Sequence, residues 1–428
     1  MPRVGDGLDA VTAFAGAVAA GMALFLPFTF ATATALGSPY RVTSLVNSVP
    51  RAAALGLIVA VVVAVLVRPL NRPGLVWLSA ACAATILAIN YFVGRTISDA
   101  DVLTTQNYID ALSGGALFGA LAVCSLRRRW PAVGFGVGTV VVFVYGELIS
   151  AFSSNTLNAQ KSVSTPAWLV LAAVVLLAVS TVRHRHGVML PALPRIAADL
   201  PITPIIAATV LALSVLLASE WLAHEFDGRV GNSWQIGIAV TVTVIAAFVA
   251  ALLLPARDGT WALVAVSLSA AADTMADSQH MGPHLIVVLI LGTVGVLIGL
   301  RWSSAWLVLA GAAMLCGYAA LEERLPWALA WGVGLALLAF VTGYAFGSVR
   351  VGYLPSAVLG LGALYLPTVM WVIPTKARNW PIGGTPVDGS IPGRAALAIT
   401  AGAAAALWLL LRIRPITPVR TAENVAEP

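Results

Sequence analysis

Charged residues are scarce in this sequence. Only 10% of its 428 residues are charged and 60% are hydrophobic, whereas soluble domains carry about 25% charged residues. The apolar excess runs along the whole chain, which excludes an ordinary soluble protein and indicates a bilayer as the solvent. Backbone polar groups in a bilayer are satisfied only in helices or closed barrels. Because the apolar runs are long and rich in Ala, Val and Leu, they favour helices over alternating barrel strands.

Lysine is nearly absent, since only Lys161 and Lys376 are lysines among the 24 basic residues. The arginines stand singly or in twos and threes at the ends of apolar runs. That pattern is typical of membrane orientation and not of a nucleic-acid interface. Heavy use of Arg and Ala is typical of a high-GC bacterium, so we expect a protein of a bacterial cytoplasmic (inner) membrane.

Cysteine and catalytic motifs are also scarce. The three cysteines lie far apart inside apolar runs, without a CxxC pair, and we expect them to be core residues. His280 and His284 have i,i+4 spacing, but Gly282 and Pro283 between them predict a turn, so no metal site is expected. The sequence contains no GxxxxGK[ST], GxSxG or HExxH motif. ATP-driven transport within this chain is therefore excluded, and no cofactor is expected.

Long apolar runs are abundant, and a helix needs about 20 apolar residues to cross the hydrocarbon. The sequence therefore predicts an all-α integral membrane protein with about 14 transmembrane helices, or 12 to 14 given that several runs are short. The expected helices are residues 10–36, 52–67, 74–94, 111–126, 131–152, 166–182, 203–223, 235–254, 259–276, 284–300, 302–321, 326–346, 352–373 and 395–411. With both termini in the cytoplasm, the inner side carries the basic excess that the positive-inside rule requires.

A loop rich in Pro and basic residues, 183–204, follows the sixth expected helix and predicts a cytoplasmic linker between two halves. The expected division is then a first six-helix half at 1–182 and a second at 205–346. Residues 347–428 would hold two extra C-terminal helices and a short cytoplasmic tail.

Two similar loops suggest an internal duplication. Asn-Arg-Pro-Gly at 71–74 joins the second and third expected helices, and Ala-Arg-Asp-Gly at 256–259 joins the eighth and ninth. A second repeated feature is the Arg-Trp pair, which occurs at 129–130 and again at 301–302. Six intervening helices keep both loops on one side, as in the parallel repeats of secondary transporters. Coincidence is the alternative, because Arg and Gly are common at cytoplasmic helix ends.

These loops resemble the major facilitator superfamily, which carries an Asp-Arg-x-Gly-Arg-Arg loop between helices two and three and a weaker copy between eight and nine. Arg72 with Gly74 and Arg257 with Gly259 look like its Arg-x-Gly core. The preceding Asp and the following basic residues are missing in both copies. The resemblance implies that these two arginines brace the cytoplasmic ends of the half-bundles during switching. Ordinary orientation signals are the alternative interpretation.

Ionisable residues inside a membrane are costly and are candidates for function. Asp273 is the first candidate for a substrate or ion path, because burial of a carboxylate raises its pKa and suits proton coupling. Glu147 and Glu220 are the next candidates. Asn90 is a further candidate, because it is a polar residue in the third expected helix as Asp273 is in the ninth. The alternative for each acid is a wetted position at the outer headgroup layer.

We expect a secondary transporter or a lipid or glycolipid flippase, with a lipid or small-molecule substrate in a path between two half-bundles. One alternative is a glycosyltransferase that uses a lipid-linked sugar. It is disfavoured because the expected first outer loop, 37–51, has no acid, although Asp99 and Asp101 lie in the second. Another alternative is a non-catalytic subunit of an envelope complex, in which Asp273, Glu147 and Asn90 could be replaced without loss.

Overall fold

The computed structural model describes residues 4–25, 39–70, 72–94, 100–154, 167–187, 202–226, 233–255, 257–275, 285–321, 327–349, 353–373 and 389–414. Their regular structure is helical, with fourteen α-helices and two short 3-10 helices, which confirms the expected fold class and helix number. The elements are α1 (Val4–Phe25), α3 (Pro39–Val67), α4 (Pro73–Gly94), α5 (Ala100–Ser125), α6 (Arg129–Ser154), α7 (Ala167–His184), α8 (Thr203–Phe226), α9 (Ser233–Leu253), α10 (Thr260–Met275), α11 (Leu285–Arg301), α12 (Ala305–Leu321), α13 (Trp327–Ser348), α14 (Leu354–Gly362), η2 (Ala363–Tyr365), η3 (Val369–Val372) and α15 (Ser390–Ile413).

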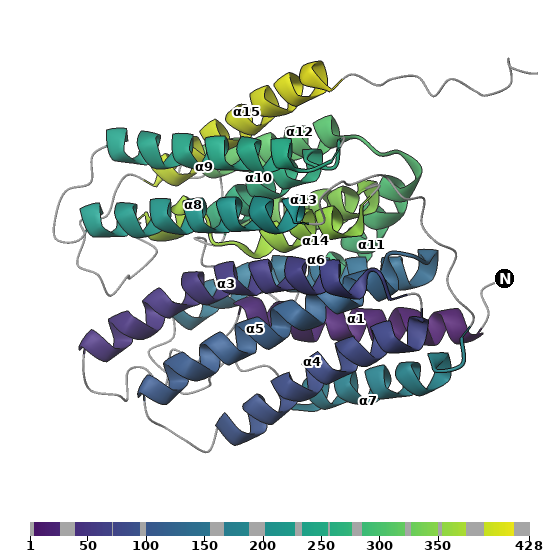
Figure 1. The fold of residues 1–428 in the computed structure, drawn as a ribbon. Coiled ribbons are helices and arrows are strands. Elements are labelled where there is room, and N and C mark those ends of the chain that lie inside the picture. The colour runs from purple at the N-terminus through teal and green to yellow at the C-terminus, as the bar shows by residue number, and fades with distance from the viewer. Residues whose placement is uncertain are drawn as a thin grey trace, which may run out of the picture.

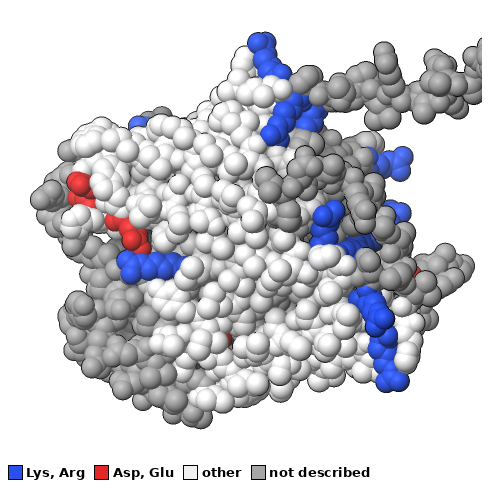
Figure 2. Space-filling view, in the orientation of Figure 1, with Lys and Arg blue, Asp and Glu red and all other residues white. Residues whose placement is uncertain are grey.

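The outer surface is apolar across its middle. Among the described residues, 8 helices are long and apolar enough to cross a membrane, and many large aliphatic side chains on them are exposed. In Figure 2 the charged side chains gather toward two opposite ends of the face shown, with most basic groups at one end and an uncharged band between the ends. This distribution fits a hydrocarbon layer about 30 Å thick. The chain is a multi-pass membrane protein.

The first six helices form one packed set. Within it α1 packs on α6, α3 on α5, and α4 on both α5 and α7. Figure 1 shows these helices in the lower part of the molecule, with α3 and α6 lying against the later part of the chain. The described helices within residues 1–182 thus make most of their helix contacts with one another, and the domain boundary stays a prediction.

The same pairing recurs later in the chain. There α10 packs on α14, α11 on α13, and α12 on both α13 and α15. The recurrence begins at α10, and α8 and α9 lie between the two sets. The sequence had predicted a second half at 205–346 followed by two extra helices at 347–428. The helix contacts favour a second set at α10–α15, with the extra pair inserted in the middle of the chain.

Small residues allow the closest helix pair of the first set. A Cβ atom on Gly115 of α5 would collide with the carbonyl oxygen of Gly56 in α3, and one on Gly119 would collide with that of Ala60. These glycines form a G-x-x-x-G stripe, which lets two membrane helices approach backbone to backbone. Packing of this kind replaces the hydrophobic driving force that is absent between helices in lipid.

The second set has the same close glycine packing between its second and fourth helices, α11 and α13. A Cβ atom on Gly343 of α13 would collide with the carbonyl oxygen of Gly292 in α11, and one on Gly347 with that of Val296. The two G-x-x-x-G stripes lie on the fourth helix of each set and face the second helix of each set. The stripes therefore support the equivalence of the two sets independently of the pairing order.

Two helices extend well beyond their expected starts. The stretch expected as the first outer loop is helical from Pro39, and α5 begins at Ala100 and not near residue 111. Proline fits the first turn of a helix, where its missing N–H is not needed. The polar extensions are joined where Asn107 donates to Ser48 at 2.8 Å, both side chains being buried. Hydropathy detected only the lipid-spanning part of each helix.

The inserted helices connect the two sets. Helix α8 packs on α3 of the first set, and α9 packs on α15 and α10 of the second. Arg51 of α3 donates to Glu220 of α8 at 2.5 Å, with half of the Arg51 side chain and about a third of the Glu220 side chain exposed. Glu220, a candidate for the transport path, therefore forms an ion pair on an exposed edge of the helix bundle.

Replacing Glu220 by Gln is expected to change the free energy of unfolding by less than about 1 kcal/mol, because exposed ion pairs are strongly screened by solvent. The measurement is the thermal unfolding midpoint of the purified variant against the wild type in the same detergent. A loss above about 2 kcal/mol would contradict the solvent-screened description of this pair.

Candidate functional site

An aromatic cluster lies where the two helix sets meet. Phe118 of α5 is 5.1 Å from Phe135 of α6 and 5.5 Å from Tyr365 of η2, measured between ring centroids. Phe135 is 5.8 Å from Phe346 of α13. All four side chains are buried. Two of the rings come from each set, so this cluster closes the seam between them.

A second contact joins the sets at the basic end of the molecule. The Arg68 guanidinium at the end of α3 lies over the Tyr353 ring just before α14, with Cζ 4.2 Å from the ring centroid. The Tyr353 backbone N–H donates to the buried Asp258 carboxylate at 3.0 Å. Arg127 donates to the Arg68 carbonyl at 3.0 Å, and burial lowers the pKa of the Arg127 guanidinium. The seam is thus closed at this end by a cation–π contact.

The element expected as one helix over 352–373 is broken. Helix α14 ends at Gly362, and after η2 the chain becomes extended at Leu366, with φ −78° and ψ 122°. Pro367 causes this, because its ring disfavours helical ψ in the preceding residue and it has no N–H to donate. Leu364 lies about 15 Å along this element from Leu354, at 1.5 Å per residue, which places the break near the middle of the bilayer.

Side chains of α10 bind the backbone groups that the break frees. The Ser269 hydroxyl donates to the Leu366 carbonyl at 2.8 Å and lies 3.3 Å from the Leu364 carbonyl. The Asp273 carboxylate accepts from the Thr368 N–H at 2.9 Å and from the Thr368 hydroxyl. Ser269 and Asp273 stand four residues apart, so they share one face of α10.

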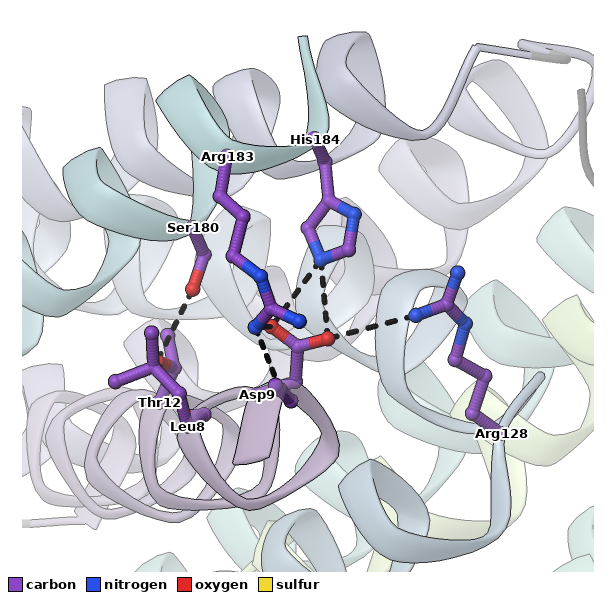
Figure 3. A network of polar contacts seen from close by, with 8 residues as sticks. Leu8, Asp9, Thr12, Arg128, Ser180, Arg183 and His184 are labelled. Carbon is purple, nitrogen blue, oxygen red and sulfur yellow. Dashed lines mark hydrogen bonds and ion pairs between the residues drawn. The ribbon is translucent and has the colours of Figure 1, made fainter. Parts of the chain in front are cut away.

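A third polar site lies at the basic end of the first set (Figure 3). Asp9 of α1 is fully buried, and His184 at the end of α7 lies 3.0 Å from its carboxylate. Arg183 reaches the same carboxylate at 3.2 Å and Arg128 at 3.5 Å. Thr12 and Ser180 bond one turn deeper at 3.1 Å. One carboxylate therefore ties together the ends of α1, α6 and α7.

A small cavity lies beside this network. Asp9, Trp77, Arg127 and Arg128 help line it, and its volume is about 10 Å³, roughly the space of one water molecule. The Trp77 ring stacks on His184 with centroids 5.9 Å apart. This space is too small for a substrate. We therefore interpret the Asp9 network as a structural contact that holds the ends of three helices together.

The structure separates the residues predicted for a substrate or ion path. Asp273 is 1% exposed and lies at the break, which argues against a wetted headgroup position. Asn90 donates to Asp110 at 2.7 Å and to the Gln106 carbonyl at 3.2 Å, linking α4 to α5 within the first set. Glu147 lies in α6, and its side chain is outside the described part of the structure. The three whose side chains are described, Asp273, Asn90 and Glu220, form no common site.

The residues predicted as gating loops lie in different surroundings. Arg72 is exposed, and Gly74 packs against the last turn of α7 at the His184 carbonyl. Arg257 donates to the Arg414 carbonyl at 3.2 Å, and Gly259 packs against the Ala251 carbonyl of α9. The first loop joins α3 to α4, whereas the second joins the inserted α9 to α10. The two loops are therefore not equivalent by helix pairing, and a switching role for them stays a prediction.

Sequence reasoning missed Asp9, Ser269 and Thr368. Asp9 stands just before the first expected helix, at 10–36, and its partners come more than 110 residues later. Ser269 and Thr368 are neutral residues of a kind common in membrane helices, and they meet only because the chain folds back. A usable signal was Pro367 inside an otherwise apolar run, since a proline there frees backbone groups that need partners.

Comparisons with known proteins return transporters among solved structures. The human organic anion transporter MFSD10 (TETRAN) shares 15% identity, with 96% of this chain and 100% of that chain covered and a TM-score of 0.48. The xylose transporter XylE from E. coli, in a partially occluded inward open conformation, shares 12% identity over 96% and 100%, with a TM-score of 0.49. A bacterial homologue of the human drug peptide transporters PepT1 and PepT2 shares 13% over 96% and 97%, with a TM-score of 0.48. No family model matches the sequence, and no curated protein matches it.

Proposed function

We propose that this chain is a secondary transporter of the cytoplasmic membrane, built from two moving six-helix units. The first unit is α1 with α3–α7, and the second is α10–α15. The observation that carries the proposal is the recurrence of one helix pairing, with matching G-x-x-x-G stripes, in two sets that meet along a seam. Parallel repeats of this kind hold substrate and coupling-ion sites between the units near the bilayer midplane.

The arrangement supports a state closed on the basic side, which the positive-inside rule assigns to the cytoplasm. The Arg68–Tyr353 contact joins the units at that end, and the buried aromatic cluster joins them deeper in the bundle. A cation–π contact contributes about 0.5–2 kcal/mol, which is small enough to break and re-form in a transport cycle. Opening this side requires Arg68 to leave Tyr353 while Asp258 keeps its bond within the second unit.

The proposal differs from an envelope subunit in requiring relative motion of the two units. It leaves the substrate as a lipid or a small molecule. The test is a distance measurement between spin labels on the two cytoplasmic ends. Arg72→Cys labels the α3–α4 loop, and Trp302→Cys labels the α11–α12 loop; both positions are exposed. Cys82, Cys124 and Cys316 are first replaced by Ser or Ala.

We expect two distance populations for this pair in lipid nanodiscs, with the longer one enriched by Tyr353→Ala. The control pair, Arg72→Cys with Arg129→Cys, lies within the first unit and is expected to give one distance. A single unchanged distance between the units under every pH, salt and lipid condition, with or without Tyr353→Ala, would refute the transporter proposal.

A further inference from the structure

The helix break gathers oxygen atoms from two elements. Its carbonyl, hydroxyl and carboxylate groups come from residues that are all buried, with Asp273 at 1%, Ser269 at 2% and Thr368 at 2% exposed. The contributing atoms are the carbonyl oxygens of Leu364 and Leu366, the hydroxyls of Ser269 and Thr368, and the carboxylate of Asp273. Irregular backbone at membrane depth is tolerated where it is buried in protein or lines a cavity.

We infer that these oxygens form a binding site for Na⁺. Hard cations take carboxylate, carbonyl and hydroxyl oxygens as ligands. Unwound backbone carbonyls of broken membrane helices are the groups that coordinate Na⁺ in transporters of other folds. Nothing in the expected Arg-x-Gly loops contributes to this site, which rests only on the α10 face and the break.

Two of the oxygen–oxygen distances can be compared with the ligand shell of such a cation. A cation that binds oxygen at about 2.4 Å has neighbouring octahedral ligands about 3.4 Å apart. Ser269 Oγ lies 2.8 Å and 3.3 Å from the carbonyl oxygens of Leu366 and Leu364. The 3.3 Å distance is close to this edge length, and the 2.8 Å hydrogen bond to Leu366 would lengthen when the ion binds. To bind the ion, the Ser269 hydroxyl proton would turn away from the two carbonyl oxygens, and the Asp273 carboxylate would turn from the Thr368 donors toward the ion.

Charge balance favours a monovalent ion. The site contributes one carboxylate, and the groups that donate to it from Thr368 are a neutral N–H and a neutral hydroxyl. A net charge held in the membrane interior is costly. Na⁺ would neutralise Asp273, whereas a divalent ion would leave one positive charge at the site. A proton would also neutralise it, but would need only the carboxylate and none of the other oxygens.

The site is covered by helices outside the seam. Helices α8, α9 and α15 all pack against η3, so the inserted pair shields the break from lipid. This gives the insertion a physical role, because freed backbone groups cannot face hydrocarbon. Because the site is enclosed, an ion reaches it only when the surrounding helices move. A role for Na⁺ as the ion that drives transport rests on the proposed transporter function. The binding of Na⁺ to this site does not depend on that function.

The test is the binding of radioactive ²²Na⁺ to the purified full-length protein, with thermal unfolding in NaCl, KCl and choline chloride at one ionic strength. We expect saturable ²²Na⁺ binding and a rise of the unfolding midpoint in NaCl alone, since a ligand of the native state stabilises it. Asp273→Asn is expected to abolish both effects. Ser269→Ala is expected to weaken the apparent affinity at least about tenfold, the smallest typical loss when a residue that supports a metal ligand is removed.

Glu220→Gln is the control, because it removes an acid of α8 that is paired with Arg51 and leaves the break intact. It should keep the wild-type Na⁺ response. No saturable Na⁺ effect in the wild type would overturn the inference, as would a response retained in Asp273→Asn. A midpoint that depends on pH but not on Na⁺ would replace the ion with a proton. If Na⁺ binding failed in one of these ways while the spin labels still showed two distances between the units, the transporter proposal would stand without the Na⁺ site.

Discussion

Replacing Gly119 by Leu is expected to abolish accumulation of the folded protein. A Cβ atom there would overlap the Ala60 carbonyl oxygen, which is backbone and cannot rotate away. Relief requires α5 and α3 to separate along their closest contact. Overpacking typically costs about 1–3 kcal/mol and occasionally more; backbone-to-backbone overlap along a G-x-x-x-G stripe belongs at the upper end or beyond. The measurement is the yield of monodisperse protein on size exclusion and its unfolding midpoint.

The second unit offers the same experiment in its own stripe. Gly347 meets the Val296 carbonyl as Gly119 meets that of Ala60, so Gly347→Leu is expected to fail equally. Gly237→Leu is the matched control. Gly237 is an exposed helical glycine of α9 at which a Cβ atom would meet nothing within 4 Å, and Leu is the better helix former. Wild-type behaviour of Gly119→Leu would show that α3 and α5 do not approach as described.

Replacing Asp9 by Asn is expected to lower the free energy of unfolding by about 3 kcal/mol. Removing one partner of a buried charge network leaves the others uncompensated, which costs about 3–5 kcal/mol for a fully buried pair. The lower end applies because the Arg128 and Arg183 side chains are 39% and 36% exposed. His184 is less exposed, at 10%, and lies closest to the carboxylate. The measurement is unfolding of the purified variant in nanodiscs.

Asp6→Asn provides the control for this prediction. Asp6 lies in the same helix, three residues earlier, and is partly exposed. Its replacement is expected to change stability by less than about 0.5 kcal/mol, as at ordinary surface positions. If Asp9→Asn and Asp6→Asn were equally stable, the Asp9 network would not hold α1, α6 and α7 together.

The fold class could be predicted from the sequence because a bilayer imposes one rule on every long apolar run. The helix ends could not, because α3 and α5 continue through polar residues that bond to one another. Asn107 and Ser48 are an example. Their partners are set by tertiary packing, which hydropathy does not contain. The extended backbone at Leu366 was foreseeable from Pro367, but the partners of the freed groups were not.

The two loops that suggested the internal repeat, 71–74 and 256–259, do not occupy equivalent places in the two helix sets. Short loops with Arg and Gly recur at many cytoplasmic helix ends because both residues serve topology and turns. By helix pairing, the counterpart of the α3–α4 loop is the α11–α12 loop that follows Arg301, and not the loop with Arg257. The better signal was the pair of G-x-x-x-G stripes at 115–119 and 343–347, since close helix approach constrains both residues of each stripe.

Among the path candidates whose side chains are described, Asp273 is the one that lies at a distinctive feature. An acid in an apolar run is rare and conspicuous, which is why sequence reasoning found it. Its neighbours Ser269 and Thr368 are ordinary residues for a membrane helix and acquire meaning only from the break. Asn90 and Glu220 were equally visible in the sequence, yet they bond locally or at an exposed edge.

The most direct test of the central claim is a density map of the full-length protein in a lipid nanodisc. The account predicts that α1 with α3–α7 superposes on α10–α15, that α8 and α9 lie outside both units against the break, and that Asp273 faces residues 364–368. A map in which residues 205–346 instead superposed on the first six helices would contradict it. So would an unbroken helix through residues 354–373.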